Sequence, residues 1–194
     1  MNFRTIITGT AAVLFVGASV GAFQEDGVEV DLQAILPVSA MEQTAEDRTL
    51  ATLDVDLAEH GIVVDNLRSV GSDGIADYWV SVVDDSQVCL VGYISGDNWV
   101  VASTCSTVSE FYRQGVGLEL GQGENSGTEA YLLPADIDAE QLGLPAEAST
   151  FGTVKTEGAV LISVDPEGPR PAPTEVEREN GIVFQFLPLM HPER

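Results

Sequence analysis

Basic residues are scarce in this sequence. Of its 194 residues only 8 are Lys or Arg, against 31 Asp or Glu, and the formal net charge at pH 7 is −23. Lys155 is the single lysine. Nucleic acids and anionic lipid head groups repel such a chain, so nucleic acid is excluded as an expected partner. The acidity indicates solubility, and it leaves a cationic partner or calcium as the functional alternatives.

Long apolar runs are also absent, except at the N-terminus. Residues 5–23 form an uncharged run of 19 that follows Arg4. Signal-peptide cores span about 7–15 residues and membrane-spanning helices roughly 17–25, so the run fits either type of segment. Small residues at 20–22 would suit cleavage before Phe23. Whether the segment is a cleaved signal or a membrane anchor stays open.

The charges around this segment predict its orientation. Arg4 lies before the apolar run, and the positive-inside rule assigns that end to the cytoplasm. Residues 24–194 are therefore expected to be extracytoplasmic, either secreted or held by a single-pass anchor with the N-terminus inside and the C-terminus outside. The membrane would be a partner only through this N-terminal helix.

Cysteine occurs twice, at Cys89 and Cys105. An even number in an oxidising compartment favours a disulfide. Strand patterns over 87–94 and 99–105 flank a turn, and a three-residue loop at 96–98 would place Cys89 directly opposite Cys105. Opposite Cβ atoms in a sheet lie about 4.5–5.5 Å apart, within easy adjustment of disulfide geometry. The sequence therefore predicts a Cys89–Cys105 disulfide; the alternative is two buried free thiols.

Strand patterns dominate the middle of the chain. The first four are expected to form an antiparallel meander over residues 67–105, and two capping-box patterns, Thr107 with Glu110 and Asp138 with Gln141, predict short helices. We expect an α+β, β-rich fold: an antiparallel meander with short inserted helices, preceded by one N-terminal transmembrane or signal helix. The expected strands are 67–71, 76–83, 87–94, 99–105, 116–120, 128–133, 153–156 and 159–164.

Composition divides the chain into five parts. The stretch 166–181 is rich in proline and poor in apolar residues, which is typical of a linker, and the strand pattern at 182–187 is expected to return to the sheet. The expected parts are a signal peptide or transmembrane anchor at 1–23, an acidic stalk with a short helix at 24–55, a β-rich domain at 56–165, a Pro-rich linker at 166–181, and a C-terminal strand and tail at 182–194.

Recognisable metal-binding patterns are few, although the chain is acidic. The two histidines, His60 and His191, are far apart, which argues against zinc. Asp73, Asp97 and Asn98 lie in turns at one end of the expected meander and form a weak calcium candidate. Because they lack the spacing of a dedicated calcium loop, we expect turn geometry to be their main role. No cofactor is expected.

Catalytic motifs are missing as well. The single Gly-x-Ser-x-Gly string, at 17–21, lies in the apolar segment, where no nucleophile elbow can form. The glycine-rich stretch 121–127 lacks the lysine of a phosphate loop. We therefore expect no catalytic residues and a non-catalytic binding or interaction module. The alternatives are a cell-surface hydrolase with an unidentified carboxylate pair and a purely structural surface protein.

Three aromatic residues could bind a sugar or a peptide. In the expected register Tyr93 and Trp99 share the face of the cysteines, and Trp79 is expected there too. Such residues form either an aromatic patch for a ligand or a core that packs against the disulfide.

Several short strings resemble those of small exported proteins of actinobacteria. They are 78–80, 88–91, 99–105, 115–118 and 129–134, and the resemblance covers about residues 66–136. It implies an N-terminal anchor or signal and two cysteines in a tryptophan-containing β region, and it implies no activity. A protein, a peptide or a cell-wall component is the expected partner.

Overall fold

A computed structural model describes residues 30–53, 57–58, 62–97, 99–121, 127–144, 151–156, 158–164 and 171–189. Of residues 151–156 it describes the backbone. The apolar segment 5–23 lies outside the described residues, and no described helix has the length and apolar character needed to cross a bilayer.

The predicted meander is confirmed. Strands β1 (Arg68–Ser72), β2 (Asp77–Val83), β3 (Gln87–Ile94) and β4 (Val100–Thr107) form one antiparallel sheet in the order β1-β2-β3-β4. The register places Cys89 opposite Cys105, as the three-residue loop predicted.

A second sheet follows a short helix. Helix α2 (Val108–Gln114) begins with the predicted capping box, in which Thr107 Oγ1 accepts from Glu110 N at 3.1 Å and Thr107 N donates to Glu110 Oε2 at 3.0 Å. The second sheet is antiparallel, with the order β5-β6-β8-β7. Its strands are β5 (Val116–Gly121), β6 (Gly127–Leu133), β7 (Phe151–Thr156) and β8 (Ala159–Val164).

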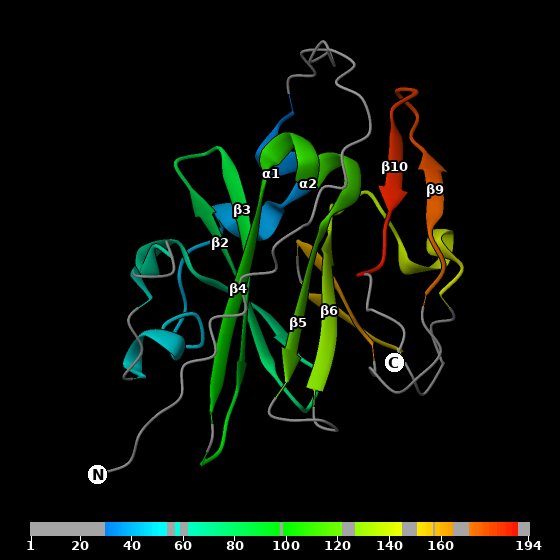
Figure 1. Cartoon of the computed structure of the whole chain (residues 1–194). Coiled ribbons are helices and arrows are strands. Elements are labelled where there is room, and N and C mark those ends of the chain that lie inside the picture. Colours follow the sequence, from blue (N-terminus) through cyan, green and yellow to red (C-terminus); the bar gives the residue numbers. More distant parts are fainter. Residues whose placement is uncertain are drawn as a thin grey trace, which may run out of the picture.

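The two sheets pack face to face around the main core. Val80 and Leu90 of the first sheet contact a cluster that includes Leu132 and Leu161 of the second. Strand β4 lies beside β5, and β1 lies beside β7, so the edges of the sheets face one another (Figure 1). The sheets approach closely at Gly92, where a Cβ atom would lie 2.5 Å from Leu120 Cδ1.

The N-terminal segment packs on the domain in two places. One part joins the core between the two sheets through Ile35, Leu36 and Val38, and the other covers the outer face of the first sheet through Leu50, Leu57 and Ile62. The segment contains α1 (Leu32–Ile35) and the 3-10 turns η1 (Pro37–Ala40), η2 (Leu50–Thr52) and η4 (Val64–Asn66). Leu36 and Leu50 are fully buried, and Val38 N donates to Gly158 O at 3.2 Å. The described part of the predicted stalk is therefore packed on the domain by its buried leucines. The sequence did not indicate this packing, because these leucines are scattered and follow no helical or strand period.

A β-ribbon covers the outer face of the second sheet. Strands β9 (Thr174–Glu177) and β10 (Val183–Phe186) pair with each other, and with η5 (Ala139–Leu142) they pack on Tyr131 and Ile162. The expectation that the last strand returns to the main sheet is wrong, and β9 lies within the stretch predicted as a linker. Short strands with one apolar face can form here because Phe184 and Phe186 bury themselves in the core beneath.

The coarse fold prediction is thus confirmed. The described chain is β-rich, with antiparallel sheets and a few short helices. The expected N-terminal helix lies outside the described residues.

Asp47 fastens the N-terminal segment to the first sheet. Its buried carboxylate accepts from Thr44 N and, at 2.5 Å, from Ser69 N beside the irregularity in β1. Burial alone would raise the pKa of this carboxyl, but the hydrogen bonds from Thr44 and Ser69 outweigh it and hold the pKa below its ordinary value. The ionised form is therefore favoured in the folded state.

Asp47 makes the stability of the protein sensitive to acid. Because its pKa is lower in the folded state, its contribution is complete above the unfolded pKa of about 3.9 and is lost as the pH falls below that value towards the folded pKa. We expect Asp47→Asn to cost about 1 kcal/mol at neutral pH and to flatten the stability profile below pH ~4. Urea unfolding at several pH values measures this. An unchanged slope in the variant would contradict the assignment, and Asp31→Asn, at an exposed cap, is the control.

Candidate functional site

The structure contains a cleft of about 460 Å³ beside the β-ribbon. Its walls come from three places in the chain: Tyr112 of α2, the segment 136–141, and residues 176–180 at the end of β9 and in the following turn. Concave sites with a few convergent polar groups are the usual binding sites of proteins.

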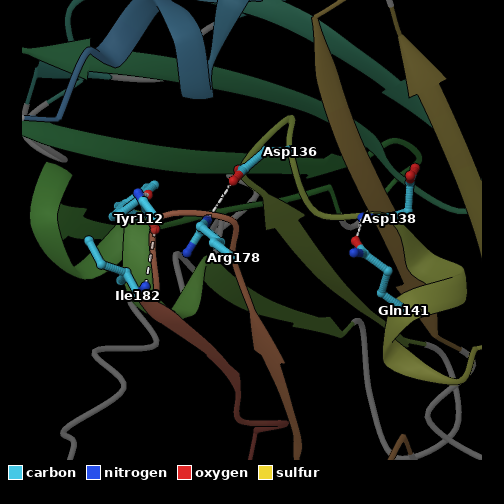
Figure 2. A network of polar contacts seen from close by, with 7 residues as sticks. Tyr112, Asp136, Asp138, Gln141, Arg178 and Ile182 are labelled. Atoms are coloured by element: carbon cyan, nitrogen blue, oxygen red, sulfur yellow. Dashed lines mark hydrogen bonds and ion pairs between the residues drawn. The ribbon is translucent and has the colours of Figure 1, made fainter.

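Arg178 lines this cleft with an almost fully buried side chain. Its side chain is only 5% exposed, and its Nε and Nη2 donate to the two oxygens of Asp136 at 2.5 and 3.2 Å (Figure 2). The guanidinium carbon lies 3.8 Å from the centre of the Tyr112 ring and 5.4 Å from that of Phe184. A planar guanidinium suits such a forked ion pair and such stacking, where a lysine would not.

One nitrogen of this buried cation remains without a partner. Arg178 Nη1 is buried and makes no hydrogen bond within the described part of the chain. Buried polar groups in native proteins are almost always hydrogen-bonded, and an unpaired charged donor is costly. This nitrogen therefore marks a place where an acceptor would gain energy.

Neighbouring hydrogen bonds fix the walls of the cleft. Asn180 Nδ2 donates to the Tyr112 hydroxyl at 2.8 Å, and Ile182 N donates to Asn180 Oδ1 at 3.1 Å. On the other side Asp138 N donates to Gln141 Oε1 at 2.8 Å, one half of the capping box predicted there (Figure 2). The ring, the turn and the start of η5 are thus held in place before any ligand arrives.

The cleft carries more negative than positive charge. Glu177 and Glu179 are exposed at its rim, and the side chain of Asp136 is 43% exposed. Each Asp136 oxygen accepts one hydrogen bond from Arg178, and a carboxylate oxygen has room for another. Three carboxylates against one guanidinium make the cleft suitable for a ligand with a cationic group.

The predicted disulfide is present. Cys89 and Cys105 are bonded, with their Cα atoms 4.0 Å apart. Cys89 is fully buried, whereas Cys105 is exposed on the outer face of β4. The pair holds an edge strand to the centre of the first sheet.

The three aromatic residues share one cluster, but it is part of the core. Trp79 is 3% exposed, and its Nε1 donates to Glu46 O at 3.3 Å. Tyr93 and Trp99 are half-buried against the same cluster, which Leu50 and Leu67 cover. This arrangement matches the alternative in which the aromatics pack on the cysteine face of the sheet.

Asp73, one of the calcium candidates, has a structural role. Its Oδ1 accepts from Ile75 N and Ala76 N, both at 2.8 Å, and its Oδ2 accepts from the hydroxyls of Tyr78 at 2.8 Å and Thr128 at 2.6 Å. Burial is the main cause of a raised pKa of the Tyr78 phenol. Asp73 thus closes the β1–β2 turn and links it to the second sheet.

The remaining metal candidates are not brought together in the part of the chain that the structure describes. No group of three or more potential ligands among His, Cys, Asp and Glu occurs there. Asn98, His60 and His191 lie outside the described residues.

The register also brings two carboxylates opposite one another. Glu119 on β5 pairs with Glu129 on β6; Glu119 is exposed, and Glu129 is buried and accepts a hydrogen bond from the Tyr131 hydroxyl. Neither lines the cleft. The arrangement gives the hydrolase alternative a named pair of carboxylates.

No family model, curated protein or solved structure matches this chain. The resemblance to exported actinobacterial proteins therefore stays a prediction, and the geometry alone must carry the functional argument. Sequence analysis missed Arg178 because it lies in the stretch interpreted as a linker. The signal available was Asn180-Gly181, a common hairpin turn pair, followed by alternating apolar residues.

Proposed function

We propose that this protein is an extracytoplasmic, non-catalytic binding module and that the cleft at Arg178 is its ligand site. The segment 5–23 delivers the module across the membrane or anchors it there. The Cys89–Cys105 disulfide supports this location, since disulfides persist in oxidising compartments.

The buried guanidinium with one unpaired nitrogen carries the proposal. Arg178 is held by Asp136 and Tyr112, so its position is set before binding. A ligand acceptor at Nη1 would remove the cost of the unpaired donor, and a fixed donor loses little entropy on binding. Neither Glu119 nor Glu129 lines this cleft, which favours binding over hydrolysis there.

A thermal-unfolding panel tests the proposed site. Short peptides, cell-wall sugars and small carboxylates are added in turn to the wild type and to Arg178→Lys, which keeps the charge but loses the fork. At least one class is expected to raise the Tm of the wild type, by the equivalent of about 2.7 kcal/mol at a hundredfold excess over Kd, and to lose this effect in the variant. If no class shifts the Tm, or if the shift survives in Arg178→Lys, the cleft is not the site.

Export is tested separately. Residues 1–23 are fused to a reporter enzyme that folds only in an oxidising compartment, and mass analysis of the native protein identifies the first residue. An active reporter is expected, together with a mature chain that starts at Met1 for an anchor or at Phe23 for a cleaved signal. A fusion protein that stays in the cytoplasm with an inactive reporter would refute export.

A further inference from the structure

Among the described residues, the outer edge of β9 has no strand partner, and this edge lies beside the Arg178 cleft. Arg178 N donates to Ile182 O at 3.0 Å, so the main-chain groups of Arg178 point towards β10. Main-chain groups alternate along an antiparallel strand, and those of Glu175 and Glu177 therefore point away from β10. Within the described residues β9 pairs with β10 alone.

This edge differs from the edges of the two main sheets. Strands β4 and β5, and likewise β1 and β7, lie next to each other and shield one another, whereas β9 lies beside β10 and the short helix η5 and has no strand of the main sheets at its edge among the described residues (Figure 1). An exposed edge strand is a template for another extended chain, and proteins that use it for recognition bind peptides by strand addition. Glu177 belongs both to this edge and to the cleft wall.

Charge selects the peptide that would add here. Glu175, Glu177 and Glu179 are all exposed, and Asp136 is half-exposed beside them. Side chains of an added strand alternate, so every second residue would lie on the side of these carboxylates. A second copy of this chain would bring the same carboxylates against them and would be repelled, as would an acidic peptide.

We propose that the cleft and the edge of β9 together bind an extended basic peptide. The peptide main chain hydrogen-bonds with Glu175 and Glu177, one of its carbonyl groups reaches Arg178 Nη1, and its Lys or Arg side chains pair with Asp136, Glu177 and Glu179. This inference rests on the proposed function, since it names the ligand class of the same site.

Three capped pentapeptides of alternating residues test it by calorimetric titration. One alternates valine and lysine, the second alternates valine and glutamate, and the third is the lysine peptide with every main-chain amide N-methylated, which cannot donate main-chain hydrogen bonds. The lysine peptide is expected to bind, the glutamate peptide to bind at least tenfold more weakly, and the N-methylated peptide likewise. Equal binding of the glutamate peptide would overturn the charge argument, and equal binding of the N-methylated peptide would overturn strand addition.

Matched variants locate the binding. The pair Glu177→Gln and Glu179→Gln is expected to weaken the lysine peptide about tenfold. The pair Glu42→Gln and Glu46→Gln makes the same change of charge at exposed positions in the N-terminal segment and is expected to leave affinity within about twofold. Equal losses in both pairs would show attraction by net charge alone and would overturn the site.

The failure of this inference is distinguishable from failure of the proposed function. If sugars or carboxylates stabilise the wild type through Arg178 while the lysine peptide does not bind, the ligand class is wrong and the site stands. If the lysine peptide binds equally to wild type and Arg178→Lys, and no other class depends on Arg178, the cleft is wrong as well. An amide signal of Glu177 that shifts and gains exchange protection with the lysine peptide would support both.

Discussion

Replacing both cysteines by alanine is expected to lower the free energy of unfolding by roughly 3 kcal/mol. The disulfide closes a loop with a sequence separation of 16, and in the chain-entropy model the bond stabilises by restricting the unfolded chain. For a protein of this size the loss corresponds to a fall in Tm of about 10 °C. Thermal and urea unfolding of the double variant measure it.

Reduction of the wild type is the matched comparison. Cys105 is exposed, so a thiol reductant can attack one of the sulfurs in the folded state. Reduced wild type and the alanine variant are expected to have similar stability, and reductant should leave the variant unchanged. A wild type whose Tm does not change on full reduction would show that the disulfide adds nothing to stability.

Asp136→Asn is expected to destabilise the protein by about 2 kcal/mol. The substitution leaves the Arg178 cation buried without its counter-charge, and breaking a fully buried pair costs about 3–5 kcal/mol. The smaller value allows for the 43% exposure of the Asp136 side chain. Urea unfolding of the variant, compared with Asp138→Asn on the same loop, measures the effect.

The double variant Asp136→Asn with Arg178→Met separates two contributions to the lost stability: the cost of a buried, unpaired cation and the cost of lost packing contacts. Methionine can retain the contact with Tyr112 and Phe184, and no cation is then left unpaired. We expect the double variant to be more stable than Asp136→Asn alone, although it should bind no ligand at the cleft. If the two substitutions are additive in the free energy of unfolding, the two side chains are not coupled.

The local parts of the fold could be predicted from the sequence. The turn at 96–98 and the alternation around it were sufficient to place Cys89 opposite Cys105, and Thr107 with Glu110 marked the start of α2. These features depend on residues close in the chain, where the geometry of the turn and the alternation of apolar residues decide which residues pair.

The non-local parts could not be predicted. Strand β8 pairs with both β6 and β7, and Leu36 and Leu50 find their places on sheets that follow much later. Nor does an isolated Arg in a Pro-rich stretch indicate a buried ion pair, because its partner Asp136 lies on another element. The cleft exists only after the ribbon, α2 and η5 have come together.

The contact between Val38 and Gly158 bears on the order in which the parts of the chain fold. Gly158 has φ +88°, and a Cβ atom there would lie 2.6 Å from Val38 N, so the two backbones meet directly. If the chain is exported from its N-terminus, residues 36–38 appear first, but the β7–β8 turn that receives them appears only after most of the domain has crossed. The meander can form in the meantime from neighbouring hairpins, and the earliest segment to arrive would be among the last to dock.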